Sequence, residues 1–89
     1  MEIDAFVEDE LRSDEIQKGQ VRYSLIVFKE DSRNPVLIRA QDPLTLPGEG
    51  ESFEIRSDGR TLKGIVDEKR MVMSHSPNHL NIVVTIALK

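Results

Sequence analysis

The sequence predicts a mainly β protein: a small SH3-like or OB-like antiparallel barrel of about six short strands, preceded by one short N-terminal helix. From Val21 onward, apolar and polar residues alternate in short runs, as they do in half-buried strands. Clusters of Gly, Pro, Asn and Asp separate these runs at intervals of roughly 8–15 residues, which is typical of strands joined by turns. Closing the sheet into a barrel would leave no strand edge exposed. An open antiparallel sheet with the helix on one face is the alternative.

Residues 1–20 form an acidic segment, in which we expect a short amphipathic helix over about residues 3–12. The apolar residues of that stretch recur at the spacing of one helical face: Ile3, Phe6, Val7 and Leu11. Seven acidic and two basic side chains give the segment a charge of −5, whereas residues 21–89 carry a charge of +1. The segment could be a solvated flank, a docking arm for a basic partner, or a cover over the protein's own basic face.

The next two strands are predicted over about residues 21–28 and 36–40. The first strand alternates at its start, but its later part, LIVF, is apolar on both faces, so its outer face should be covered. The cluster EDSRNP at residues 30–35 is a turn signal, and Pro35 biases Asn34 towards extended geometry. The two runs are therefore expected to pair as a hairpin.

The strongest hairpin signal is Asp58-Gly59, which lies between the runs FEIR and RTLKGIV. A type I′ turn needs positive φ at both central residues, and Asp and Gly tolerate it. If the apolar residues of this hairpin point inwards, its charged residues point outwards. The preceding segment, DPLTLPGEGE at residues 42–51, contains two Pro and two Gly and is expected to be an irregular connection.

The C-terminal third of the chain predicts two more strands. DEKR at residues 67–70 is interpreted as a charged turn before a short strand at residues 71–73. Residues 80–89 form the longest β-prone stretch and are apolar on both faces. This last strand is therefore expected to be central in the sheet or buried on both sides.

Length and composition predict one soluble domain in the cytoplasm. At 89 residues the chain is expected to hold a single barrel domain, residues 21–89, behind the acidic segment. Cysteine is absent, which excludes disulfides, thiolate metal sites and a cysteine nucleophile. The first 20 residues lack the pattern of a signal peptide, and no apolar run approaches the ~20 residues that span a bilayer.

Candidates for catalysis and metal binding fail on geometry. The two histidines, His75 and His79, flank Pro77 in MSHSPNHLN, so a loop is expected there and not the helix that would place both imidazoles on one face. Ser74 and Ser76 are adjacent to His75 and would point to the opposite face of a strand. PGEGE lacks the lysine and the following helix of a phosphate loop. We therefore expect no enzymatic activity, no metal and no cofactor. The remaining role for the two histidines would be a pH-sensitive contact with a partner.

Residues 53–73, FEIRSDGRTLKGIVDEKRMVM, resemble the first conserved motif of Sm and LSm proteins. Besides the alternating apolar residues, the likeness consists of Asp58, Gly59, Arg60, Leu62, Gly64, Val66 and Asp67. Met71 stands where the RNA-binding loop would begin, Val72 stands in place of the base-contacting asparagine, and the second motif is absent. The resemblance covers under a quarter of the chain and implies a small barrel.

Two sets of residues are candidates for binding. Outward cations around the Asp-Gly hairpin could hold phosphates or an acidic peptide, or protect a strand edge: Arg56, Arg60, Lys63, Lys69 and Arg70. Apolar residues on the outer face of the strands exceed what one small core can cover and could form an interface: Ile26, Phe28, Val72, Val83 and Ala87.

The predicted function is a non-enzymatic protein-interaction or assembly module that binds a protein partner or forms a homo-oligomer. Binding of nucleic acid or of nucleotide phosphates through the basic hairpin is the alternative. The acidic overall charge and the scarcity of aromatic residues for base stacking argue against that alternative. A membrane partner is not expected.

Overall fold

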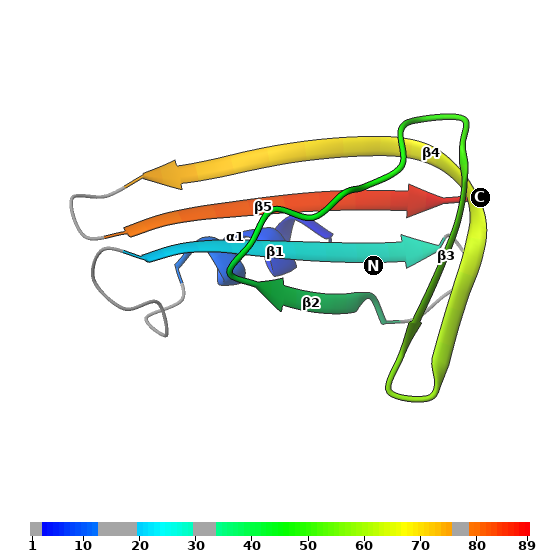
Figure 1. The fold of residues 1–89 in the computed structure, drawn as a ribbon, viewed down its shortest axis with the longest axis horizontal. Helices are drawn as coiled ribbons and strands as arrows, with labels where there is room; N and C mark the ends of the chain where they lie inside the picture. Colours follow the sequence, from blue (N-terminus) through cyan, green and yellow to red (C-terminus); the bar gives the residue numbers. More distant parts are fainter. Residues whose placement is uncertain (1–2, 13–19, 30–33, 76–78) are drawn as a thin grey trace.

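A computed structural model describes residues 3–12, 20–29, 34–75 and 79–89 of the protein. The elements in these ranges are α1 (Ile3–Leu11), β1 (Gln20–Lys29), β2 (Val36–Ala40), β3 (Ser52–Ser57), β4 (Arg60–His75) and β5 (His79–Leu88). The strands form one sheet in the order β2-β1-β5-β4-β3 (Figure 1). The sheet curls into a nearly closed barrel. This confirms the predicted fold class. Within the described ranges, no helix is long and apolar enough to cross a membrane.

The helix and both hairpins predicted from the sequence are confirmed. α1 occupies nearly the predicted residues, and β1 pairs antiparallel with β2. β3 pairs antiparallel with β4 on either side of Asp58 and Gly59. These two residues have φ angles of 51° and 78°, which are the positive values that the tight turn requires.

The predicted turn at residues 67–70 is wrong, because the strands expected on either side of it are one continuous strand, β4. The sheet therefore has five strands and not about six. β4 pairs with β3 up to Ile65 and with β5 from Val66 onward, with a bulge between Val66 and Glu68. A bulge adds one unpaired residue and bends its strand, so β4 changes partner without a turn.

One pairing differs from the predicted antiparallel arrangement: β1 and β5 lie parallel along the whole length of β1. β5 lies between β1 and β4, which confirms its predicted central position. Its buried side chains occupy both faces of the sheet: Asn81, Ile82, Val83, Val84, Thr85, Ile86 and Leu88. Burial on both faces is characteristic of parallel strands and accounts for the nearly unbroken apolar run of β5.

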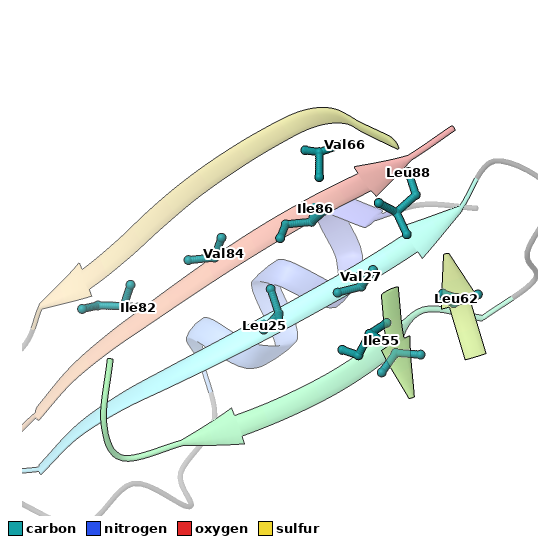
Figure 2. Close-up of a cluster of buried hydrophobic side chains, with 10 residues drawn as sticks. Leu25, Val27, Ile55, Leu62, Val66, Ile82, Val84, Ile86 and Leu88 are labelled. Atoms are coloured by element: carbon teal, nitrogen blue, oxygen red, sulfur yellow. The ribbon is translucent and has the colours of Figure 1, made fainter. Parts of the chain in front are cut away.

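One face of the sheet carries the main apolar core (Figure 2). The β3–β4 hairpin stands across one end of this face and buries Ile55 and Leu62 against Val27 and Leu88. The predicted orientation of the hairpin is confirmed, because Ile55 and Leu62 point inwards while Arg56 and Lys63 are exposed. The hairpin covers only part of the face, and the connection after β2 crosses the remainder (Figure 1).

α1 covers the opposite face of the sheet. Val7 is buried against Ile26 of β1 and Val83 of β5, and Ile3 and Leu11 pack beside them. Burying a valine or isoleucine side chain contributes about 1.5–3 kcal/mol, so this small second core is a substantial part of the stability of so short a chain. The helix supplies the cover that the two-sided apolar run of β1 requires.

Candidate interaction surface

The apolar interface predicted from the sequence lies beneath the protein's own helix. Ile26 and Val83 are 1% and 0% exposed under α1, and Val72 is half-buried next to them. Phe28 is half-buried near the start of the helix, beside Ile3. The sequence therefore identified a real apolar face, but α1 occupies it.

The predicted basic set is divided between different surfaces. Arg56 and Lys63 do share the outward face of the β3–β4 hairpin, where Arg56 forms an ion pair of 2.7 Å with Glu54. Lys69 and Arg70 point to opposite faces of β4, since Lys69 lines the groove described below and Arg70 reaches α1. The five cations do not form one patch.

Arg60 is engaged in holding the hairpin to β2. Its Nη2 donates a hydrogen bond of 2.7 Å to the carbonyl oxygen of Asn34, and its Nη1 donates one of 3.4 Å to that of Pro35. The two acceptors are the residues that precede β2. The guanidinium thus links two hairpins that are distant in the sequence.

The acidic N-terminal segment does contact basic residues, although only one of them was in the predicted set. At the start of α1, Asp4 forms an ion pair of 2.8 Å with Arg70 of β4. At the end of α1, Glu10 forms ion pairs with Arg22 of β1 and Arg39 of β2. The helix is therefore fastened to the sheet at both ends.

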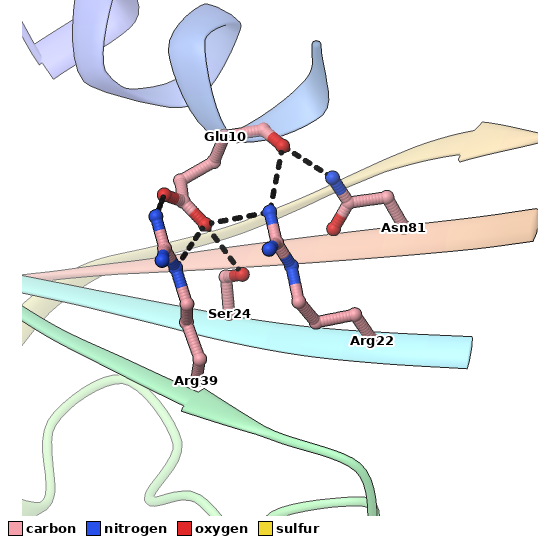
Figure 3. A network of polar contacts seen from close by, with 5 residues as sticks. All are labelled: Glu10, Arg22, Ser24, Arg39 and Asn81. Carbon is pink, nitrogen blue, oxygen red and sulfur yellow. Dashed lines mark hydrogen bonds and ion pairs between the residues drawn. The ribbon is translucent and has the colours of Figure 1, made fainter. Parts of the chain in front are cut away.

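Glu10 is the centre of a buried polar network under the end of α1 (Figure 3). Its Oε1 accepts a hydrogen bond of 2.6 Å from Arg39, and its Oε2 accepts one of 2.8 Å from Ser24 and one of 3.2 Å from Arg22. Its backbone carbonyl accepts hydrogen bonds from Arg22, at 3.2 Å, and from Asn81. Side chains from three strands thus satisfy both the carboxylate and a carbonyl of the last helical turn.

This network was missed in the sequence, where Glu10 counted only as one of seven acidic residues. The available signal was a set of polar residues on strand faces that are otherwise apolar. They are Arg22 and Ser24, on the same face of β1 as Ile26, and Asn81, on the same face of β5 as Val83. Buried polar groups need partners, and such partners have to come from another element. A carboxylate in the acidic segment was the obvious complement to two arginines.

Burial by itself raises the pKa of Glu10, but hydrogen bonds from Arg39 and Ser24 and the positive charges of Arg39 and Arg22 together lower the pKa below its ordinary value of 4.5. Between the two values the unfolded chain binds the proton more tightly than the folded one. The stability that Glu10 contributes is thus fully present above pH 4.5 and is lost as the pH falls through the folded-state pKa.

We expect Glu10→Gln to remove this part of the acid sensitivity. The free energy of unfolding, measured by denaturant titration at a series of pH values, should fall less steeply below pH 4.5 in the variant than in the wild type. The difference between the two curves isolates Glu10 from the other carboxylates. Parallel curves would show that the ion pairs do not lower the pKa of Glu10.

The part of the core face that the hairpin leaves uncovered carries a row of exposed apolar side chains. Met71 and Met73 of β4 are 61% and 57% exposed and lie opposite Val84 and Ile82 of β5. The connection after β2 passes in front, and between it and the sheet is a groove of about 170 Å³. We call this surface the methionine face; it consists of Tyr23, Leu44, Met71, Met73, Ile82 and Val84.

The outer edge of β4 borders the methionine face. β3 pairs with β4 only up to Ile65, and Gly50 and Glu51 hydrogen-bond to Val66 at 2.8 and 2.9 Å. Beyond this bend, no strand within the described ranges pairs with the outer edge of residues 69–75. An unpaired edge presents backbone N–H and C=O groups that can accept another strand.

His75 lies at the far end of this edge, and His79 lies on the neighbouring strand β5. β4 ends at His75, which is exposed, and β5 begins at His79. The loop predicted between them falls on residues 76–78, outside the described residues. In the part of the chain that the structure describes, no three His, Asp or Glu side chains come together as a metal site.

The resemblance to the Sm motif is limited to the hairpin. Met71, where the motif would begin its RNA-binding loop, lies inside β4 and is paired with Val84 of β5. The expected loop is therefore absent at that position. Comparisons of the chain with protein-family models, with curated proteins and with solved structures gave no match.

Proposed function

We propose that the protein is a non-enzymatic interaction module that adds an extended segment, from a protein partner or from a second copy, to the outer edge of β4. The observation that carries this proposal is the combination of an unpaired edge at residues 69–75 with the exposed Met71 and Met73 on the same strand. Backbone groups of the edge would give affinity, and alternate side chains of the added strand would reach the methionine face.

The chemistry of the methionine face supports a peptide as the ligand. Methionine is unbranched and polarisable, so it adapts to differently shaped apolar side chains. The neighbouring groove is lined mainly by apolar residues, among them Leu44, Leu46 and Tyr23. A strand on the edge could insert one or two apolar side chains there, since every second residue of a strand points to the same face.

The flanks of the edge support selective binding over indiscriminate aggregation. The bulge and the charged residues 67–70 lie immediately before Met71. Charges and bulges are the usual means by which an exposed edge is kept from pairing at random. The short apolar stretch that follows is thus accessible mainly to a segment that matches it.

Phosphate binding by the basic hairpin is less well supported. Arg56 is paired with Glu54, Arg70 with Asp4, and Arg60 is hydrogen-bonded to backbone carbonyls. A phosphate would have to compete with each of these contacts. The division of the cations between different faces also gives a nucleic-acid backbone no continuous path.

A catalytic role finds no support in the buried carboxylate. Glu10 is hydrogen-bonded to three side chains and lies beneath α1, on the face of the sheet opposite the groove. Its lowered pKa keeps it ionised near neutral pH, which does not suit a general acid.

Selection from a library of linear peptides tests the proposal. We expect the selected peptides to alternate apolar and polar residues, and Met71→Asp or Met73→Asp to weaken their binding about tenfold or more in a fluorescence-polarisation titration. Leu37→Asp is the matched control, because Leu37 is 43% exposed on β2, away from the methionine face. Equal losses in all three variants, or losses with Arg56→Ala instead, would contradict the proposed site.

A further inference from the structure

We infer that a second copy of this chain is the occupant of the β4 edge, and that the two β4 strands pair antiparallel with Val72 on a two-fold axis. The inference deepens the proposed function and rests on it. Two identical strands that are antiparallel in one sheet are related by an axis perpendicular to that sheet. Directly opposed residues of an antiparallel pair lie on the same face of the sheet. The axis therefore passes midway between two copies of the same residue, here Val72.

The sequence around Val72 is a palindrome that suits this symmetry. In Met71-Val72-Met73, each methionine meets the other methionine of the second copy, and Val72 meets itself. The two methionine pairs would bury side chains that are 61% and 57% exposed in the single chain. Directly opposed apolar residues are the pairs that stabilise an antiparallel edge.

The flanking residues also match in this register. Arg70 lies opposite Ser74 of the second copy, and Lys69 lies opposite His75. No pair of permanently charged residues of the same sign is directly opposed between positions 69 and 75, the described part of this edge. All seven edge residues find a partner, so the free edge is filled from end to end.

Neighbouring registers are less favourable. With Met71 on the axis, Met73 would meet Lys69 and Val72 would meet Arg70. With Arg70 on the axis, two guanidinium groups would be directly opposed, which destabilises a strand pair. A shift to Met73 would place Met71 against His75. The palindrome therefore selects Val72.

The arrangement is compatible with the rest of the molecule. The connection after β2 crosses the sheet (Figure 1) and hydrogen-bonds to β4 at Val66. Val66 precedes residues 69–75, so these bonds leave the pairing edge free. α1 lies on the opposite face, where Asp4 already neutralises Arg70 at 2.8 Å. The two methionine faces would lie on one side of a continuous sheet and form a wider apolar surface.

Cysteine cross-linking tests the register, because the chain has no cysteine of its own. Under mild oxidation, a mixture of Met71→Cys and Met73→Cys should give about tenfold more disulfide-linked dimer than either variant alone, since only the mixture brings two thiols opposite each other. Leu37→Cys, with similar exposure on β2, is the control for random collision. Efficient cross-linking of Met71→Cys alone, or of the control, overturns the inference.

Paired charges provide a second test at the same two positions. Met71→Lys with Met73→Glu places opposite charges across the axis and should sediment, like the wild type, at twice the 10.1 kDa of one chain. Met71→Glu with Met73→Glu opposes like charges and should sediment as one chain.

Equal sedimentation of the two variants as dimers overturns the inference, as does a wild type that remains a single chain at millimolar concentration. A single chain that still binds the selected peptides at β4 leaves the proposed function standing, whereas loss of both activities rejects both.

Discussion

Replacing Glu10 by alanine is expected to lower the free energy of unfolding by about 3–5 kcal/mol. The substitution removes the ion pair of Glu10 with the buried Arg22, two bonds with Arg39 and one with Ser24, and loosens the last turn of α1. Removing one partner of a buried ion pair costs more than the pair contributed, because the other charge remains desolvated.

The matched control for this prediction is Asp9→Ala, one residue earlier in the same helix. Asp9 is exposed and contacts only the exposed Arg12, at 3.5 Å, among the ion pairs of the described residues. Surface pairs of this kind contribute about 0–1 kcal/mol. Denaturant titration at pH 7 compares the two variants, and a similar small loss in both would show that Glu10 is not the anchor of the helix.

Replacing Ile86 by alanine is expected to have an effect of similar size, about 2–5 kcal/mol. Ile86 is 0% exposed near the C-terminal end of β5, between the parallel partner β1 and the bent strand β4. A truncated side chain here loses burial and leaves a cavity that three strands surround, so the site cannot collapse easily.

Ile65→Ala is the control for the loss of the same atoms from a different environment. Ile65 lies on the outward face of the β3–β4 hairpin and is 47% exposed. We expect it to change the free energy of unfolding by about 0.5 kcal/mol or less. Equal effects of the two substitutions in thermal unfolding would place the core elsewhere than the centre of the sheet.

Much of the fold could be predicted because local chemistry decides it. Asp58-Gly59 accepts the positive φ of a tight turn in any context, and the spacing of Ile3, Val7 and Leu11 specifies one helical face. The two-sided apolar run of β5 required a central position. Each of these features depends on residues that are close in the sequence.

The remaining features depend on contacts between distant residues, and the sequence signals for them were ambiguous. DEKR has the composition of a turn, but with a bulge at Asp67 the same residues continue a bent strand. The parallel pairing of β1 with β5 joins segments some sixty positions apart along the chain and leaves no local mark. Pairing of this kind is decided by how the faces are covered.

The candidate site shows the same division. Ile26 and Val83 were correctly identified as an apolar face, yet the residues that cover them belong to a segment whose acidic charge suggested a solvated flank. The most exposed large apolar side chains of the described residues are Met71 and Met73, whereas the predicted interface included only Val72, which lies between them. Their exposure follows from the bend in β4, because the hairpin turns away and covers only one end of the face.

The most direct test of the interaction surface is amide hydrogen exchange followed by NMR, with the edge free and with it occupied by a selected peptide or by a second copy at high concentration. We expect exchange to slow at every second amide of β4 between Lys69 and His75, those that point away from β5, while the amides of β2 at the other edge of the sheet keep their rates. Slowing confined to β2 or to the β3–β4 hairpin, with the β4 edge unchanged, would contradict the assignment of β4 as the binding edge.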